Sequence, residues 1–312
     1  MAEPISALAP LPLLVALGLL AWISSAGVAI GRGRTPALAL TDPPMEAARL
    51  VRQHRRSTVE ADVVLWRIGA WGLLPVAALL LALVPWGFGS GSGSGGALLG
   101  SSVGVVWANA LDVAVWALLW LLGWGANSVA GLVGGYRFLA LALAYELPLM
   151  FALVAPAVAA GSLDLSVIAE AQAGLWYVVW MPVAFVAYLI GVVGFAVHGP
   201  LAQPAGRDIG GGVLAELSGP DLLAARLGRH ALLGAGAAIA VPLFLGGGAG
   251  PWLPDPAWVA IKALLLTGAL AWVAGRSAAL RTPRLMEPLW VVLLPLVVVQ
   301  DLVAAIVAQA TS

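Results

Sequence analysis

The chain has 312 residues, of which 62% are hydrophobic and only 10% are charged. A soluble domain carries about 25% charged residues on its surface, so this composition excludes an ordinary soluble protein and predicts one embedded in a lipid bilayer. The 15 basic and 15 acidic residues cancel, which gives no electrostatic reason to expect a nucleic-acid partner. With no cysteine, the chain cannot supply a catalytic thiol, cysteine-ligated zinc or an iron–sulfur cluster.

Eight apolar segments are long enough to cross the hydrocarbon core, which takes roughly 20 helical residues. They cover residues 5–30, 62–86, 102–124, 134–160, 173–198, 221–248, 256–275 and 285–309. We therefore predict an all-α, polytopic integral membrane protein, with about eight transmembrane helices in a single membrane domain, 1–312. The first segment is too long for the apolar region of a signal peptide and is expected to remain as a span. Residues 87–101 are rich in Gly and Ser and predict a flexible external loop.

The basic residues alternate between connections. They lie in or beside the odd-numbered ones: Arg32, Arg34, Arg49, Arg52, Arg55, Arg56 and Arg67; Arg137; Arg207, Arg226 and Arg229; Arg276, Arg281 and Arg284. The exception, Lys262, falls inside span seven. Because basic loops stay in the cytoplasm, we predict that both termini lie outside a bacterial or archaeal cytoplasmic (inner) membrane.

The first connection contains a predicted helix, 42–57, with Asp42 as its N-cap and two prolines in its first turn. Met45, Leu50 and Val51 give it a modest apolar face. The helix could lie on anionic lipid headgroups or dock a cytoplasmic partner, and the two roles are compatible. The expected docking residues are Asp42, Glu46, Arg49, Arg52, Arg55 and Arg56.

Three charged residues stand out inside spans, where a charge at mid-bilayer costs about 2.5–3.5 kcal/mol to insert. They are Asp112, Glu146 and Lys262. One interpretation is structural, with the charges paired to each other or to helix carbonyls. The other is a proton or ion path through the bundle. Pro148 closely follows Glu146 and is expected to kink that helix and make room for water.

The fifth connection, 199–220, is glycine-rich and predicted to be cytoplasmic. Its carboxylates, Asp208 and Glu216, are expected to be solvated, with a short helix near 213–217. Three scattered histidines, His54, His198 and His230, make a histidine-rich metal site unexpected. Redox chemistry, if present, must belong to a partner.

Several strings resemble a known family. The stretch GWGANSVAGLVGGYRFLALALAYELPL, the segment GGGVLAELSGPDLLAARL and the final stretch from WVAIKALLL to LLPLVVV occur in the order seen in the H subunit of bacterial NADH–quinone oxidoreductase, or complex I. The family also occurs in membrane-bound NiFe hydrogenases and formate hydrogenlyase-like complexes. The resemblance covers nearly the whole chain and implies an eight-span core.

The resemblance implies a non-catalytic membrane anchor that links electron transfer to proton or sodium translocation. By motif match, Glu146 and Lys262 fall on intramembrane positions of the family, Glu216 on a loop Glu, and Asp208 near an acidic loop position. The implied partners are antiporter-like membrane subunits and hydrophilic subunits that carry iron–sulfur clusters and a NiFe-like centre. This chain is expected to bind no redox centre itself, although the resemblance allows a quinone at the interface with a partner.

Two family strings are missing. A Glu-Arg-Lys string at the end of span one and a Gly-Pro-Asn string after it are replaced by ISSAGVAIGRGRTPALALTDP, and the acid-rich loop is reduced to HGPLAQPAGRD. These losses favour the hydrogenase-like branch, with the quinone-module H subunit of a true complex I as the alternative. A standalone ion transporter or channel and a purely structural anchor are the rivals from other classes.

Overall fold

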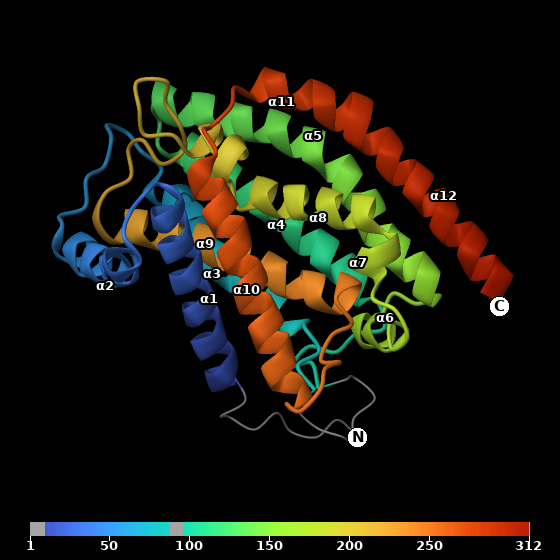
Figure 1. The fold of residues 1–312 in the computed structure, drawn as a ribbon. Helices are drawn as coiled ribbons and strands as arrows, with labels where there is room; N and C mark the ends of the chain where they lie inside the picture. Colours follow the sequence, from blue (N-terminus) through green and yellow to red (C-terminus); the bar gives the residue numbers. More distant parts are fainter. Residues whose placement is uncertain (1–9, 88–95, 312) are drawn as a thin grey trace.

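The computed structural model describes residues 10–87 and 96–311, and these residues form a bundle of α-helices (Figure 1). The helices are α1 (Pro10–Gly31), α2 (Pro36–Arg52), α3 (Val63–Ala82), α4 (Gly104–Gly125), α5 (Val129–Ala160), α6 (Leu165–Glu170), α7 (Tyr177–Trp180), α8 (Pro182–Phe195), α9 (Gly219–Phe244), α10 (Asp255–Arg276), α11 (Thr282–Pro288) and α12 (Leu294–Thr311). No strand occurs in these ranges. The predicted residues 5–9 of span one and 88–95 of the external loop lie outside them.

Eight helical segments among the described residues are long and apolar enough to cross a membrane. This confirms the predicted all-α, eight-span architecture. The eighth segment runs from Thr282 to Ala310 and joins α11 and α12 through a π-helical turn, Leu289–Leu293. Only 17% of its most apolar window is buried inside the protein, against 83% for α9.

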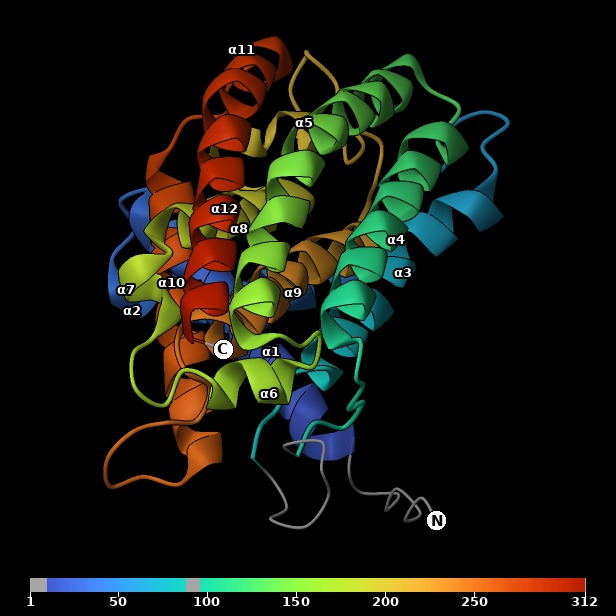
Figure 2. The same cartoon turned by 90° about the vertical axis from the view of Figure 1, so that its right-hand side faces the viewer.

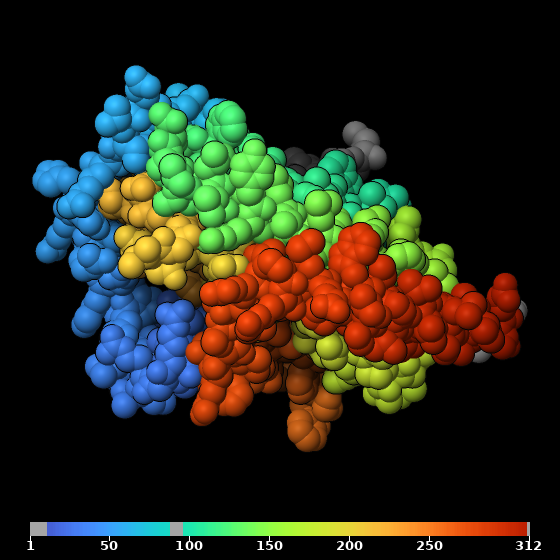
Figure 3. All heavy atoms as spheres, turned by 90° about the horizontal axis from the view of Figure 1, so that it is seen from above, coloured from blue at the N-terminus to red at the C-terminus, as the bar shows by residue number. Residues whose placement is uncertain are grey.

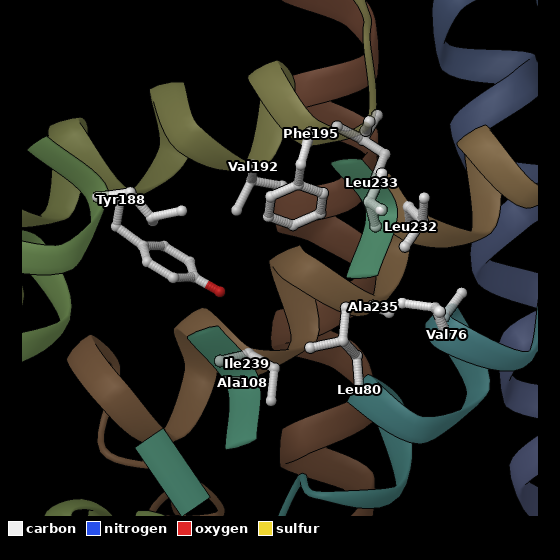
Figure 4. Packing of buried hydrophobic residues seen from close by; sticks show 14 of the residues in the cluster. Val76, Leu80, Ala108, Tyr188, Val192, Phe195, Leu232, Leu233, Ala235 and Ile239 are labelled. Atoms are coloured by element: carbon white, nitrogen blue, oxygen red, sulfur yellow. The ribbon is translucent and has the colours of Figure 1, made fainter. Parts of the chain in front are cut away.

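Helix α9 is the centre of the bundle. Alanines and glycines are interspersed along it with leucines, so that neighbouring helices approach it closely. In Figure 4 Leu232, Ala235 and Ile239 of α9 face side chains from α3 and α8, including Leu80 and Tyr188. Surrounded in this way, α9 can present polar groups to the protein interior rather than to lipid.

Helix α12 lies on the outside. Figure 2 shows α12, α5 and α4 side by side, and Figure 3 shows the end of α12 projecting beyond the rest of the molecule. Large apolar side chains such as Val299, Leu302 and Ile306 are more than half exposed. Since the protein itself leaves these side chains largely uncovered, lipid or another membrane subunit covers them in the membrane.

The odd-numbered connections meet at one end of the bundle, which we call the arginine end. The hydrogen bonds that join them include Arg56 N–H to Ser218 Oγ at 2.7 Å, Thr58 Oγ1 to the Ala126 carbonyl, and Leu280 N–H to the Pro200 carbonyl at 2.8 Å. The even-numbered connections meet at the opposite end. There Val105 N–H donates to the Leu163 carbonyl at 3.1 Å, and Gln172 Nε2 donates to the Pro242 carbonyl at 2.7 Å. The segregation that the arginines imply is therefore real, and which end faces the cytoplasm stays a prediction.

The helix of the first connection begins earlier than predicted. It starts at Pro36, with Thr35 as N-cap, so Asp42 is not the cap and both Pro43 and Pro44 lie inside the helix. A proline cannot donate to the carbonyl four residues before it, which leaves the Leu40 carbonyl free at Pro44. The Trp22 indole N–H of α1 donates to this carbonyl at 2.9 Å. A tertiary contact thus compensates for the internal proline.

The predicted start of span five and the predicted short helix in the fifth connection are also wrong. Span five does not begin at residue 173, because the chain there forms a turn and the four-residue α7, and the long helix starts at Pro182. Residues 213–217 form turns and bends rather than a helix. Instead, two short 3₁₀ helices, Gly199–Leu201 and Gln203–Ala205, begin the fifth connection.

Helices α1 and α10 pack backbone to backbone through glycines. A Cβ added at Gly275 would lie 2.3 Å from the Val28 carbonyl oxygen, and one at Gly31 would lie 2.3 Å from the Trp272 carbonyl oxygen. Such small-residue contacts are typical of membrane helix pairs, which gain no hydrophobic energy from association in lipid.

We expect Gly275→Leu to force these two helices apart and to destabilise the protein by about 1–3 kcal/mol. Thermal unfolding of the detergent-solubilised protein measures this loss. Gly18→Leu is the matched control on α1, because a Cβ at Gly18 meets no atom within 4 Å. Equal melting temperatures for the two variants would contradict the close packing.

Candidate functional site: a buried carboxyl pair and an arginine-lined cavity

Two of the three predicted membrane charges lie together. Asp112 of α4 is 2% exposed and Glu146 of α5 is 9% exposed, and their carboxyl groups are close enough for their charges to interact. The Tyr145 hydroxyl donates a hydrogen bond to Asp112 Oδ1 at 3.2 Å. Among the described residues, Asp112 Oδ2 and Glu146 Oε2 have no hydrogen-bond partner. Adjacent buried carboxyls with spare acceptors can take up and release a proton.

Further polar groups continue along the same face of α4. Asn109 and Trp116 stand three residues before and four residues after Asp112, the spacing that aligns side chains on one helix face. Asn109 Oδ1 and Trp116 Nε1 are also buried and unpartnered within the described ranges. Unpaired polar atoms in a row are suitable hosts for buried water. The helical spacing could have revealed this row in the sequence.

Lys262 does not join the carboxyl pair. Its Nζ donates to the carbonyls of Leu245, Gly247 and Ala249 at 2.8, 2.8 and 2.9 Å, and it lies 4.3 Å from the centre of the Trp176 ring. Lys262 takes part in none of the ion pairs formed by the described residues. The carbonyls belong to the chain that leaves α9, so the geometry matches the structural interpretation in which an intramembrane charge pairs with helix-end carbonyls.

The acids of the fifth connection lie apart from the carboxyl pair and from Lys262. Asp208 is exposed and Glu216 is partly buried at the arginine end. Arg137 of α5 holds this connection, because its guanidinium donates to the Gly210 and Gly211 carbonyls at 2.6 and 3.2 Å. The connection is therefore clamped onto α5, the helix that carries Glu146.

The predicted docking residues form a network of ion pairs around α2. Glu46 accepts from Arg49 at 2.7 Å and from Arg226 of α9 at 2.7 Å. The Arg49 hydrogen bond is the main cause that holds the pKa of Glu46 below its ordinary value, with Arg226 adding to it. Asp42 pairs with Arg34 at 3.4 Å.

The rest of this segment faces the start of α9. Arg55 lies 3.5 Å from Asp221, Arg56 is bound through its backbone N–H, and Arg52 is exposed. Met45 and Val51, predicted to form an apolar face with Leu50, are 67% and 60% exposed, whereas Leu50 is buried. The helix is therefore anchored on one side and leaves apolar surface for lipid or a partner.

A cavity of about 790 Å³ lies between α1, α2, α9 and the fifth connection. Its apolar wall includes Gly18, Ala21, Trp22, Val28, Leu50 and Leu223. Its charged side chains are Arg32, Arg34, Arg49, Arg207, Arg226 and Arg229, together with Asp42 and Glu46. The lining thus combines apolar side chains suited to a hydrocarbon ligand with side chains that supply hydrogen-bond donors.

The comparison with known proteins agrees with the resemblance. The sequence profile of the NADH dehydrogenase family matches residues 6–305. One H subunit of the NADH-quinone oxidoreductase of Geobacter metallireducens is 33% identical over 293 residues, which are 91% of this chain and 87% of that protein. This chain belongs to the H-subunit family of NADH dehydrogenase. A corresponding H subunit of Geobacter sulfurreducens is 31% identical over 296 residues, with the same 91% and 87% covered, and one of Rhodopseudomonas palustris is 32% identical over 223 residues, covering 68% and 70%.

Some polar groups of this membrane protein were missed in the sequence. Asp301 lies in span eight with both carboxylate oxygens buried and, within the described part, unpartnered. Its neighbour Gln300 donates to the Trp180 carbonyl at 3.2 Å. The Gln-Asp pair inside the apolar run VVVQDLVAA was a sufficient signal. His198 and His230 meet across the bundle, with ring centres 4.8 Å apart, and no local pattern indicates this.

Proposed function

We propose that this chain is the quinone-module membrane subunit of an NADH–quinone oxidoreductase-type complex. In this role it docks the hydrophilic redox arm at the arginine end and links electron transfer to proton or sodium translocation. The names of its relatives favour this function over a NiFe hydrogenase anchor, which the missing family strings had suggested.

The cavity is the observation that carries the proposal. Its volume of about 790 Å³ lies in the ordinary range for small-molecule sites, roughly 300–1,000 Å³. The apolar wall formed by residues such as Trp22 and Leu223 would hold the isoprenoid tail and ring. Guanidinium groups such as those of Arg229 and Arg32 also line the cavity and would meet ring oxygens.

Electrons come from a partner in this proposal. Quinone takes up two electrons and two protons to become quinol, and an iron–sulfur cluster in a hydrophilic subunit supplies the electrons. The present chain binds the ring, excludes water with its apolar wall and offers hydrogen bonds. The cavity lies against α2 and the fifth connection, the expected docking surfaces for that subunit.

Ion movement would use the carboxyl pair. A charge change in the cavity would act on the fifth connection, with Asp208 and Glu216, and through the Arg137 clamp on α5. Protonation of Glu146 and Asp112 would then follow the redox state. Lys262 lies outside this path and holds the chain that leaves α9.

The test is quinone reduction by the tagged complex purified from its own membranes. We expect co-purified redox subunits and activity with a short-chain quinone, and we expect Leu227→Trp, which fills the cavity wall, to raise the quinone KM at least tenfold. Leu253→Trp is the matched control, since Leu253 is exposed at the opposite end.

Three results would contradict the proposal. Co-purification of a NiFe subunit without quinone reduction would assign the hydrogenase branch. Ion transport by the purified single chain in liposomes would assign a standalone transporter. Equal quinone KM values for the two Trp variants would show that the cavity does not bind the quinone.

A further inference from the structure

Two histidines of the cavity wall, His198 and His230, lie beside the buried Ser24, and we call these three residues the histidine site. Ser24 Oγ of α1 lies 2.9 Å from His230 Nδ1 of α9, and the His198 and His230 rings lie 4.8 Å apart. Both rings line the cavity. Three elements distant in sequence therefore bring these side chains to one place.

The backbone beside His198 is in an unfavourable conformation. Val197 has φ +55°, a region that β-branched residues rarely occupy. Arg229 stabilises this turn, because its guanidinium donates to the Ala196 carbonyl at 3.2 Å and to the Val197 carbonyl. Strain of this kind persists where the surrounding structure requires it and is frequent at binding sites.

The histidine site has unused hydrogen-bonding capacity. His198 is 5% exposed, and its Nδ1 has no partner within the described residues. When the Ser24 hydroxyl donates to His230 Nδ1, the proton of that imidazole resides on Nε2. This N–H is then a donor for a ligand in the cavity.

We propose that the histidine site binds a ring oxygen of the quinone, with His230 Nε2–H as the donor. The His198 ring packs against the His230 ring and sets the plane of that imidazole. This inference rests on the proposed function and names a recognition group for its ligand. The oxygen is a carbonyl in the quinone and a hydroxyl in the quinol, and a neutral imidazole can bond to both.

Charged groups surround the site from every neighbouring element. Arg32, just after α1, and Arg226 and Arg229 of α9 act on His230. The cavity wall adds Arg49, Asp42 and Glu46 from α2 and Arg207 from the fifth connection. The surplus of cations favours the partial negative charge of a carbonyl oxygen, so the electrostatics agree with the proposed orientation.

The experiment compares His230→Phe with His230→Gln in the purified complex, because the Gln side-chain amide can restore a donor near Nε2. We expect His230→Phe to raise the KM for a short-chain quinone about tenfold, as for one lost hydrogen bond, with a smaller change in kcat. His230→Gln should recover a KM within about threefold of the wild-type value. Ser24→Ala, which removes only the hydroxyl, should raise the KM several-fold.

Ser101→Ala is the matched control, because this hydroxyl accepts a backbone N–H at the opposite end. An unchanged KM in His230→Phe and Ser24→Ala, in a complex that reduces quinone, would overturn the histidine site alone. Absence of quinone reduction in the wild-type complex would instead overturn the proposed function. If His230→Phe does not assemble, Ser24→Ala with an unchanged KM is sufficient to reject the site.

Discussion

Glu146→Gln is expected to abolish ion translocation coupled to quinone reduction while the complex still assembles. Glutamine has nearly the shape of glutamate but cannot carry a proton between sites, and Glu146 is 9% exposed beside Asp112. Its Oε2 is unpartnered among the described residues, so the substitution breaks no observed hydrogen bond at that atom. The measurement is the ion gradient formed per quinone reduced in proteoliposomes, which should fall at least tenfold.

Glu170→Gln provides the matched control for this result, because Glu170 is exposed at the end of α6. Native gels compare assembly of the two variants. A Glu146→Gln complex that forms a normal gradient would remove the carboxyl pair from the ion path and leave it as internal packing.

Lys262→Met is expected to destabilise the protein by on the order of 3 kcal/mol. The substitution keeps an apolar chain of similar length but leaves three carbonyls without the ammonium that bonds them, and buried acceptors without a donor cost about 1–3 kcal/mol each. The substitution does not leave a carboxylate without its counter-ion, because the partners of Lys262 are backbone oxygens. Thermal unfolding of the solubilised complex should show a melting temperature lower by several degrees.

Arg276→Met separates this effect from simple loss of charge. Arg276 lies on the same helix, exposed, with its guanidinium 5.2 Å from the Trp272 ring centre. Its removal should change the melting temperature little. If Lys262→Met were as stable as Arg276→Met yet failed to translocate ions, Lys262 would belong to the ion path and the carbonyl anchor would be wrong.

The number of spans and their segregation into two ends could be predicted because both follow from local composition. Each span must satisfy its own backbone hydrogen bonds in lipid, so its length is determined by consecutive residues. The start of α2 was missed because Pro43 and Pro44 are typical of a first helical turn. The residue that allows them inside the helix is Trp22, on another element.

The site was predictable only where one residue is unusual by itself. Asp112, Glu146 and Lys262 stand out since charges are expensive in a membrane. Which of them meet depends on helix packing. Helix α5 packs against α4, which brings Glu146 beside Asp112, whereas Lys262 meets the chain that follows α9. His198 and His230 are ordinary residues individually, and their contact requires the end of α8 to lie beside α9.

The close pairing of α1 with α10 also affects how the protein is made. At about 5–20 residues per second, the ribosome needs on the order of ten seconds or more to reach α10 after α1 has emerged. During that interval the glycine face of α1, with Gly27 and Gly31, has no final partner and must be covered by lipid or by the insertion machinery. A truncated chain that ends before α10 would thus leave the glycine face of its first helix permanently uncovered by the protein, a state that membrane quality control can recognise.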